Sequence, residues 1–451
     1  MASGSKAAAL EKELIDKGVK YLLPTYSDMH GRSKSKMVPI SHYHRMIEGS
    51  ELCTGAAVEG VPQEVNDEEV ASHPDPDSCI ILPWKPDTAW FASDLWCEGK
   101  PFEACSRNIL GRVLADAARM GYGAHVGIEA EFCVLRDEAG GGYAPLNARP
   151  HLVKPAYDVA RLLENMQWMG ELIDAMNGLG WGVYSFDHED AIGQFEIDFN
   201  YFEAKTMADR LVFFRLMADE IARRHGGFAS FMPKPFGDRA GSGAHFNMSL
   251  FAQGDKGNLF EAADDRRGCG LSEIGYQFIA GVLKHLPAIC AVVAPTVNSY
   301  KRLVPRGSRA GFTWAPIFVC YGGNNRTNTL RIPLGGGRVE LRLPDASCNP
   351  YLGLAMTIAA GLEGIRDGLD PGLPHTDNMY LKTRAELDSI GVSMLPRSLG
   401  EALEAFDADP LGRSVMGDAM ARAWLEYKRE EWHAYSVHVT EWEKERYLKF
   451  F

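Results

Sequence analysis

The sequence contains no uninterrupted hydrophobic run long enough to cross a membrane, which takes roughly 20 apolar residues as a helix. Its most apolar long stretch, residues 278–297, is interrupted by Lys284, His285, Pro287 and Pro295. The chain also has no excess of positive charge, since its formal net charge is -13. Nucleic acids and anionic membranes attract basic proteins, so we expect neither as a partner.

No two cysteines have the CxxC spacing that is common in zinc sites, and their pattern is not that of a dense disulfide framework. All nine are scattered along the chain: Cys53, Cys79, Cys97, Cys105, Cys133, Cys269, Cys290, Cys320 and Cys348. The N-terminal segment has small residues and a short Lys/Glu-rich helix pattern but no apolar signal core. Reduced thiols and a cytoplasmic location are therefore expected.

The length of 451 residues exceeds what one compact core usually supports, so two domains are expected. Residues 33–94 hold short apolar stretches separated by many Pro and Gly residues, as in a small β-rich domain. From residue 107 onward, strand-like and helix-like segments alternate without a strict βαβ rhythm. We predict an α+β fold with an N-terminal domain over residues 1–106 and a larger domain with an antiparallel sheet over residues 107–451.

The expected helices have apolar residues at every third or fourth position, and the expected strands alternate or are apolar throughout. Helices are predicted at residues 7–17, 107–120, 157–179, 204–224, 272–290, 399–406 and 413–432, with a further one from residue 349. The main strands are predicted at residues 21–26, 125–135, 243–251 and 339–343.

Residues 187–198 form the most acidic candidate site. Apolar and polar side chains alternate at its end, so Gln194, Glu196 and Asp198 share one strand face, with Glu189 on the turn before it. Clustered carboxylates repel one another unless a cation compensates them, and oxygen ligands suit Mg²⁺ or Mn²⁺. Taken alone, the stretch is equally compatible with the charged outer face of an ordinary strand.

Two further strands carry polar side chains in the same alternating way. Glu129 and Glu131 share a face of an otherwise apolar strand, which is hard to explain structurally and favours metal binding. His245, Asn247 and Ser249 alternate in the same manner, and the neighbours of His245 make a ligand role plausible. The preceding Gly-Ser-Gly resembles a phosphate loop only weakly, because it lacks the lysine and the following helix.

Four arginines follow the acidic segments and are possible forked donors to carboxylate and phosphate oxygens. They are Arg302, Arg326, Arg331 and Arg342. A structural ion pair is the simplest explanation for any single one of them. Near several metal-type carboxylates, including Glu340 two residues before Arg342, the set favours chemistry on an anionic substrate.

Together these motifs resemble the glutamine synthetase family over nearly the whole chain. They occur in the family's order: Gly127-x-Glu-x-Glu-Phe, Glu189-x(6)-Glu, Gly241-Ser-Gly-x-His, Asn298-Ser-Tyr-Lys-Arg-Leu, Asn325-Arg-Thr, Glu340-x-Arg-x-Pro-Asp and Asn349-Pro-Tyr. The resemblance implies an N-terminal β-grasp domain and a glutamine-synthetase-type catalytic domain. It also implies a homo-oligomer, a dodecamer of stacked hexameric rings with active sites between subunits.

The resemblance also implies roles for individual residues. Two divalent ions, Mg²⁺ or Mn²⁺, are expected per active site, one on Glu131, Glu189 and Glu196 and the other on Glu129, His245 and Glu340. L-glutamate is expected at Gly241, Arg302 and Arg342. ATP is expected at Asn247, Ser249, Arg326 and Arg331. The residues placed closest to the chemistry are Glu189, Arg302, Arg326 and Arg342.

The sequence departs from the family where the amine is expected to bind. In glutamine synthetases, a lid glutamate and an aspartate from the adjacent subunit's β-grasp loop attract ammonium. Here the expected lid, residues 303–324, contains neither Asp nor Glu. The glutamate position falls near Trp314 and the aspartate aligns with Thr54. The alternative is a misalignment in this longer lid.

These departures favour an ATP-dependent ligase that joins the γ-carboxyl group of L-glutamate to a small alkylamine, methylamine first, through a γ-glutamyl phosphate. A neutral, more apolar subsite suits an amine that carries an alkyl group. The rival hypotheses are a glutamine synthetase that uses ammonia and a non-catalytic family member. Tyr380 lies near the tyrosine that some bacterial relatives adenylylate, although position alone does not establish this regulation.

Overall fold

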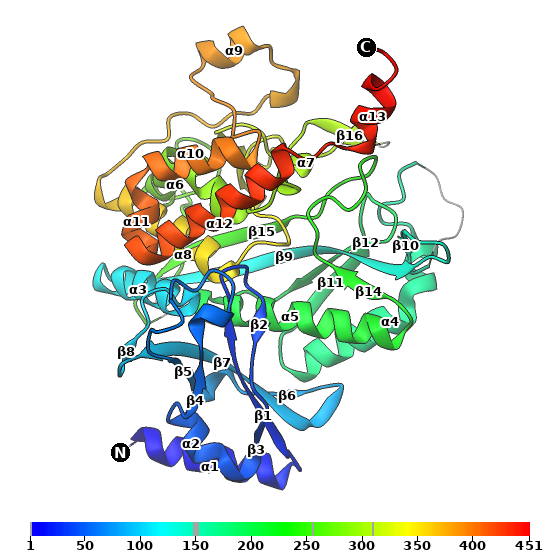
Figure 1. The fold of residues 1–451 in the computed structure, drawn as a ribbon. Coiled ribbons are helices and arrows are strands. Elements are labelled where there is room, and N and C mark those ends of the chain that lie inside the picture. Colours follow the sequence, from blue (N-terminus) through cyan, green and yellow to red (C-terminus); the bar gives the residue numbers. More distant parts are fainter. Residues whose placement is uncertain (1, 148–152, 255–256, 309–310) are drawn as a thin grey trace.

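The computed structural model describes residues 2–147, 153–254, 257–308 and 311–451. Figure 1 shows an N-terminal strand-rich region at one end of the molecule and a larger region of helices and long strands above it. The expected α+β architecture is observed.

The N-terminal region is built around the pairing of its first and longest strands, β1 and β7, which run parallel. The sheet order is β2-β1-β7-β5-β4, with β3, β6 and β8 pairing off this path. The elements are α1 (Ala2–Asp16), β1 (Tyr21–Ser27), β2 (Ser33–Lys34), β3 (Val38–Pro39), η1 (Ile40–His42), α2 (Tyr43–Ile47), β4 (Glu51–Cys53), η2 (Gly55–Ala57), β5 (Val70–Pro74), η3 (Pro76–Ser78), β6 (Ile80–Leu82), β7 (Lys85–Cys97) and β8 (Lys100–Pro101).

The larger region is organised around β9 (Tyr122–Asp137), which pairs antiparallel with β12 on one side and β15 on the other. The sheet order is β11-β12-β9-β15-β20-β19-β18, and only its last pair, β18 with β19, is described as parallel. The first half contains α3 (Ser106–Arg119), β10 (Tyr143–Pro145), α4 (Val159–Gly178), β11 (Val183–His188), β12 (Gln194–Phe199), β13 (Phe202–Glu203), α5 (Ala204–Arg224), β14 (Phe228–Ser230) and β15 (Ala244–Ala252).

The second half is mostly helical and ends with the C-terminal helices in Figure 1. Its elements are α6 (Glu273–Val293), α7 (Ser299–Arg302), β16 (Arg306–Ser308), β17 (Gly311–Phe312), β18 (Tyr321–Gly323), β19 (Leu330–Ile332), β20 (Val339–Leu341), α8 (Pro350–Arg366), η4 (Met379–Leu381), α9 (Arg384–Ser389), α10 (Leu399–Ala408), α11 (Pro410–Met416), α12 (Asp418–Ser436) and α13 (Glu441–Tyr447).

Helix α6 is apolar because it is a core helix. In the described chain it is the one helix whose length and composition would suit a membrane span, yet 78% of that apolar stretch is buried inside the protein. It packs against α8 so closely that a Cβ atom on Gly281 would lie 2.0 Å from the carbonyl oxygen of Ala360. The buried surface of α6 is thus used within the fold.

Most predicted elements are confirmed to within three residues at their helix or strand ends, and the helix at residues 204–224 is confirmed at both ends. The single helix predicted at residues 413–432 is wrong. The chain forms α11 and α12 instead, separated by Gly417, whose φ of 80° is incompatible with continuing a right-handed helix. The short elements β16, β17, α9 and α13 were not predicted, because elements this short carry little periodicity.

We propose a division of the chain after residue 106, where the strand-rich region gives way to α3. Strand β8 ends at Pro101, and α3 begins at Ser106. The N-terminal region has a hydrophobic cluster of its own, which includes Leu22 and Phe91. The two parts are nevertheless joined, because Met29 and Trp90 belong to the main hydrophobic core of the larger region.

Candidate active site

Strand register brings the predicted ligands together on one face of the large sheet. Glu131 on β9 lies opposite Glu196 on β12, and Glu129 lies opposite His245 on β15. On the next strand pair, Asn247 of β15 lies opposite Glu340 of β20. Because side chains two residues apart point to the same face, all of these groups converge.

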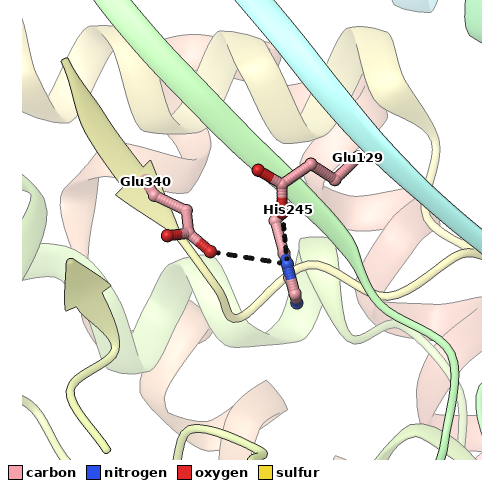
Figure 2. Close-up of side chains that lie close together, drawn as sticks. All are labelled: Glu129, His245 and Glu340. Atoms are coloured by element: carbon pink, nitrogen blue, oxygen red, sulfur yellow. Dashed lines mark hydrogen bonds and ion pairs between the residues drawn. The ribbon is translucent and has the colours of Figure 1, made fainter. Parts of the chain in front are cut away.

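His245 lies at the centre of this convergence. Its Nδ1 atom is 3.0 Å from a Glu129 oxygen and 3.5 Å from a Glu340 oxygen. Dashed lines in Figure 2 mark both contacts. Its Nε2 atom is 3.6 Å from an oxygen of Glu131. Glu129, His245 and Glu340 thus offer ligand atoms that all lie within 4.8 Å of one another, as do Glu131, Glu196 and His245.

The second of these clusters is held in place by backbone and amide donors. The amide N–H of Gly243 donates to a Glu131 oxygen at 2.7 Å, and the side chain of Gln194 donates to the same oxygen at 3.2 Å. Glu189 lies on the turn after β11 as predicted, but it is not part of either close cluster among the described residues. Its charge nevertheless interacts with that of Glu131.

Burial and mutual repulsion make the acidic side of the site unfavourable without a compensating charge. Burial, followed by the neighbouring Glu131, raises the pKa of Glu189 to about 8 and that of Glu196 well above its ordinary range. Burial and the charge of Glu129 raise the pKa of Asp198 to about 7. Such a concentration of carboxylates fits hard divalent cations, because Mg²⁺ and Mn²⁺ prefer oxygen ligands.

Glu129 shows the opposite behaviour because it has donors of its own. Burial raises its pKa, but the hydrogen bonds from His245 and Asn247 outweigh this effect and hold the pKa at about 2. Asn247 Nδ2 donates at 2.8 Å to Oε1 of Glu129, whereas His245 contacts Oε2. Glu129 is therefore ionised and oriented before any cation binds.

Arginines surround the other side of the site. Arg331 and Arg342 each donate to a different oxygen of the fully buried Glu340 at 2.5 Å. Arg302 is buried and donates to the backbone carbonyls of Arg342 and Leu343 at 3.1 and 3.0 Å. Arg331 and Arg342 thus share one carboxylate. Among the described residues, no carboxylate lies within ion-pair distance of Arg302.

Close packing explains the glycines of the Gly-Ser-Gly segment. A Cβ atom on Gly241 would lie 2.8 Å from Arg302 Cγ, and one on Gly243 would lie 2.7 Å from both Arg302 Nη2 and His245 Nε2. Glycine is therefore required for the chain to pass Arg302 and enter β15. This packing places Gly241 directly beside Arg302.

A cleft of about 450 Å³ begins at Glu129 and continues along the sheet. Asn247 and Ser249, the predicted nucleotide residues, line it together with Arg338 and Tyr184. Arg331 is not in this lining, because its side chain is held by Glu340 and by Asn324 at 2.7 Å. Arg326 is exposed on the turn before β19.

Trp314 and Thr54, the predicted amine residues, lie in different parts of the chain. Trp314 is 50% exposed, has the unusual φ of 56°, and accepts a hydrogen bond from Arg342 on its carbonyl oxygen at 3.4 Å. Thr54 is exposed in the N-terminal region, where its hydroxyl faces Glu69 at 3.5 Å. In the described part of the chain, Thr54 does not meet the acidic clusters.

The predicted lid, residues 303–324, is a loop containing the hairpin β16–β17, and its residues 309–310 lie outside the described residues. Its C-terminal part is tied down by Tyr380, whose hydroxyl donates to the carbonyl of Ala315 at 2.6 Å. Tyr380 is therefore partly buried against the lid and does not project freely into solvent.

Some residues of the site were missed by sequence reasoning. Arg338 and Tyr184 line the cleft, and the Arg338 Nε atom donates to Asn247 Oδ1 at 3.2 Å. Arg338 could have been found, since it shares the strand face of Glu340 two residues later. Tyr184 carries no such signal, because an exposed tyrosine before an acidic stretch is unremarkable in sequence.

Comparison with known proteins identifies the family. The glutamine synthetase catalytic domain matches residues 103–447. The chain belongs to the glutamine synthetase family. It is 42% identical to the glutamate–methylamine ligase of Methyloversatilis universalis, over 97% of this chain and 98% of that protein. It is 39% identical to the glutamine synthetase of Rhizobium leguminosarum bv. phaseoli, over 96% of this chain and 97% of that protein.

Solved structures give the same result for the fold. A structure described as a GmaS/ADP complex superposes with a TM-score of 0.89 at 39% identity, over 97% of this chain and 99% of that chain. An apo GmaS structure superposes with a TM-score of 0.87 at 38% identity. These findings confirm the predicted family, the glutamine-synthetase-type fold and the class of ATP-dependent glutamate–amine ligase.

Proposed function

We propose that the protein joins the γ-carboxyl group of L-glutamate to a small alkylamine, methylamine first, with ATP as the energy source. The products are γ-glutamylmethylamide, ADP and phosphate. The observation that carries this proposal is the convergence of Glu129, Glu131, Glu196 and Glu340 around His245, beside a cleft that Glu129 lines. The family relationship and the neutral amine-site residues support it.

The acidic clusters are proposed to hold a pair of divalent cations, Mg²⁺ or Mn²⁺. One set is Glu129, His245 and Glu340, and the other is Glu131 and Glu196 with Glu189, whose pKa is raised by burial and then by the charge of Glu131. When bound, such ions neutralise phosphate oxygens during phosphoryl transfer. A soluble, cytoplasmic enzyme remains our prediction.

In the first step, a γ-carboxylate oxygen of glutamate attacks the γ-phosphorus of ATP, and the bond to the β-phosphate oxygen breaks to release ADP. Asn247, Ser249 and Arg338 line the cleft, and they are proposed to hold the nucleotide. Arg302, which lies next to Gly241, and Arg342 are proposed to hold the glutamate carboxylates, while Arg326 and Arg331 are proposed at the phosphates. Fixed donors of this kind stabilise transferring phosphoryl groups without reorganisation.

In the second step, the nitrogen of the neutral amine attacks the acyl carbon of γ-glutamyl phosphate, the C–O bond to phosphate breaks, and the proton that the nitrogen loses leaves with the released phosphate. The lid must exclude water, since water would hydrolyse the acyl phosphate. Tyr380 and Arg342 hold the carbonyls of Ala315 and Trp314, which fixes the lid base beside the glutamate subsite.

The choice of amine depends on the charge around Thr54 and Trp314. Neither side chain is anionic, so the subsite attracts ammonium less strongly and leaves apolar surface for a methyl group. One observation favours the rival reaction with ammonia. Glu69 lies 3.5 Å from the Thr54 hydroxyl and supplies a carboxylate on the same edge of the N-terminal region.

The two reactions are separated by measuring phosphate release with each amine. We expect kcat/KM for methylamine to exceed that for ammonia by about tenfold or more, since a methyl contact contributes about 1–3 kcal/mol. Thr54→Asp is expected to shift the preference towards ammonia, whereas Thr54→Ser, which stays neutral, leaves it unchanged. A wild-type preference for ammonia that Glu69→Gln abolishes would instead establish a glutamine synthetase. Absence of any amine-dependent ATP turnover would revive the non-catalytic alternative.

A homo-oligomer, a dodecamer of two hexameric rings with active sites between subunits, is also proposed. Thr54 is exposed and lies in a different region from the acidic clusters, as required of a residue that completes a neighbour's site. One face of α4 supports assembly further, because Val159, Leu163 and Met166 are 64%, 65% and 53% exposed. Apolar side chains grouped on a surface mark interfaces.

Introducing a charge on this face is expected to weaken assembly. Leu163→Asp should shift the protein from the ring assembly to smaller species, measured by sedimentation velocity, because a carboxylate would be buried at the interface. Leu381→Asp is the matched control, since Leu381 has the same exposed fraction of 65% but lies on η4. Equal assembly of both variants would show that α4 is not an interface.

A further inference from the structure

A second cavity, of about 710 Å³, lies apart from the candidate active site. It is enclosed by the N-terminal turn at Gly31, by α5, by residues 228–233 and by α12. Its described lining includes none of the proposed metal, nucleotide or glutamate residues. The cavity therefore needs an explanation of its own.

Arg215 on α5 is a cation without a counter-ion in the cavity wall. Among the described residues, no carboxylate lies within ion-pair distance of it, and its Nη2 atom donates to the carbonyl of Cys348 at 2.8 Å. Its Nε atom is buried and has no hydrogen-bond partner in the described part of the chain. Burial lowers the pKa of this guanidinium, so its charge is costly to keep.

The acidic groups of the wall do not compensate Arg215, because each has other partners. Asp219 pairs with Arg223 at 2.8 Å. Glu431 accepts from Lys428 Nζ at 2.8 Å and from the backbone N–H of Val297 at 3.1 Å. Burial also lowers the pKa of His30, which keeps that ring neutral. Arg32, the other arginine of the lining, is exposed to solvent. The charge of Asp345, outside the lining and beyond ion-pair distance, compensates Arg215 only in part.

The rest of the wall is largely apolar. Leu216, Phe228, Phe231 and Met232 line it, together with Trp424, which is 0% exposed. The indole N–H of Trp424 has no acceptor among the described residues. That nitrogen has no accessible surface, so an occupant that suits the wall combines a negative charge for Arg215 with an apolar body.

We propose that this cavity binds a small carboxylate with an apolar body, its carboxylate on Arg215 and its body against Phe231 and Trp424. A carboxylate matches the planar donor geometry of a guanidinium, and a charge-assisted hydrogen bond is stronger than a neutral one. The site is independent of the proposed ligase reaction. Residues 295–298 of its wall lead directly into α7, which carries Arg302.

The test uses para-iodobenzoate as the probe on the full-length protein, without ATP, glutamate or amine. Calorimetry is expected to detect binding to the wild type, and the iodine should appear in this cavity by anomalous scattering. Arg215→Met should weaken binding at least tenfold, the loss of one charge-assisted hydrogen bond. Arg224→Met, on the exposed side of the same helix, should leave it unchanged. The uncharged analogue para-iodobenzyl alcohol should bind at least tenfold more weakly.

Arg215→Lys provides a second variant in case Arg215→Met fails to fold, because it keeps the positive charge but lacks the planar guanidinium donors. We expect it to weaken binding several-fold. No binding to the wild type, equal binding of both probes, iodine at another place, or binding at crystal concentration only would each overturn the proposal. Because turnover is not measured, these outcomes are distinct from failure of the proposed ligase function.

Discussion

Replacing Glu196 by alanine is expected to lower amine-dependent phosphate release by more than about a hundredfold while the oligomer stays intact. Glu196 lies opposite Glu131 and within ligand distance of His245, so its loss removes one of the oxygens proposed to hold a cation. A bound cation stabilises transferring phosphoryl groups by several kcal/mol, and 1.36 kcal/mol corresponds to a factor of ten in rate. Steady-state phosphate release and sedimentation measure the two quantities.

The matched control is Glu138→Ala. Glu138 follows the outer end of β9, the same strand that carries Glu131, but it is exposed. Its replacement removes an equal charge away from the sheet face and should leave the rate within a factor of two, as expected for most surface changes. Full activity of purified Glu196→Ala protein would refute the metal role. A parallel loss in Glu138→Ala would indicate a general effect of charge.

Removing divalent cations is expected to make the stability of the protein strongly dependent on pH. In the folded protein the pKa of Glu189 is raised to about 8, against an ordinary value of 4.5, and that of Glu196 is raised as well. Between about pH 4.5 and pH 8, the folded state binds more protons than the unfolded state. The free energy of unfolding therefore falls as the pH rises. The expected loss is on the order of a few kcal/mol.

Thermal denaturation of EDTA-treated protein at several pH values between 5 and 8 measures this loss, and added Mg²⁺ or Mn²⁺ should reverse it. Glu129 affects the free energy of unfolding in a separate pH range. Its pKa is lowered to about 2, so its contribution is present above about pH 4.5 and is lost only as the solution becomes more acidic.

A variant that lacks one carboxylate charge separates the repulsion among the buried carboxylates from other effects of removing the cations. Glu196→Gln keeps the shape of the side chain and removes its charge, so the metal-free variant should melt at a higher temperature than the metal-free wild type at pH 8. The same variant should gain less from added Mg²⁺. A metal-free melting temperature that does not change between pH 5 and 8 would contradict the proposed cation sites.

Two features of the site could be predicted because they depend on local alternation. The spacing of Glu129 and Glu131, and that of Glu196 and Asp198, determines that each pair shares a strand face whatever the strand pairs with. The family motifs then assigned Glu129, Glu131 and Glu196 to metal ions. Helices with a long apolar stripe, such as residues 204–224, were equally predictable because several turns repeat the same pattern.

The shared position of His245 was not predictable. The sequence assigned it to one ion only, whereas the structure places its Nε2 atom 3.6 Å from Glu131 of the other set. This contact depends on the register of β15 against β9, two strands more than a hundred residues apart in sequence. Register across such a separation is set by packing of the whole sheet, which local alternation does not contain.

The sequence by itself determined which side chains of each strand point the same way and, through the family motifs, which chemistry they serve. Only the tertiary structure decided which strands are neighbours, that Gly417 divides the last predicted helix, and that Arg215 lies in a cavity wall without a carboxylate partner among the described residues. The physical reason is the range of the interactions. Backbone periodicity acts over a few residues, whereas register, burial and charge compensation depend on contacts between distant segments.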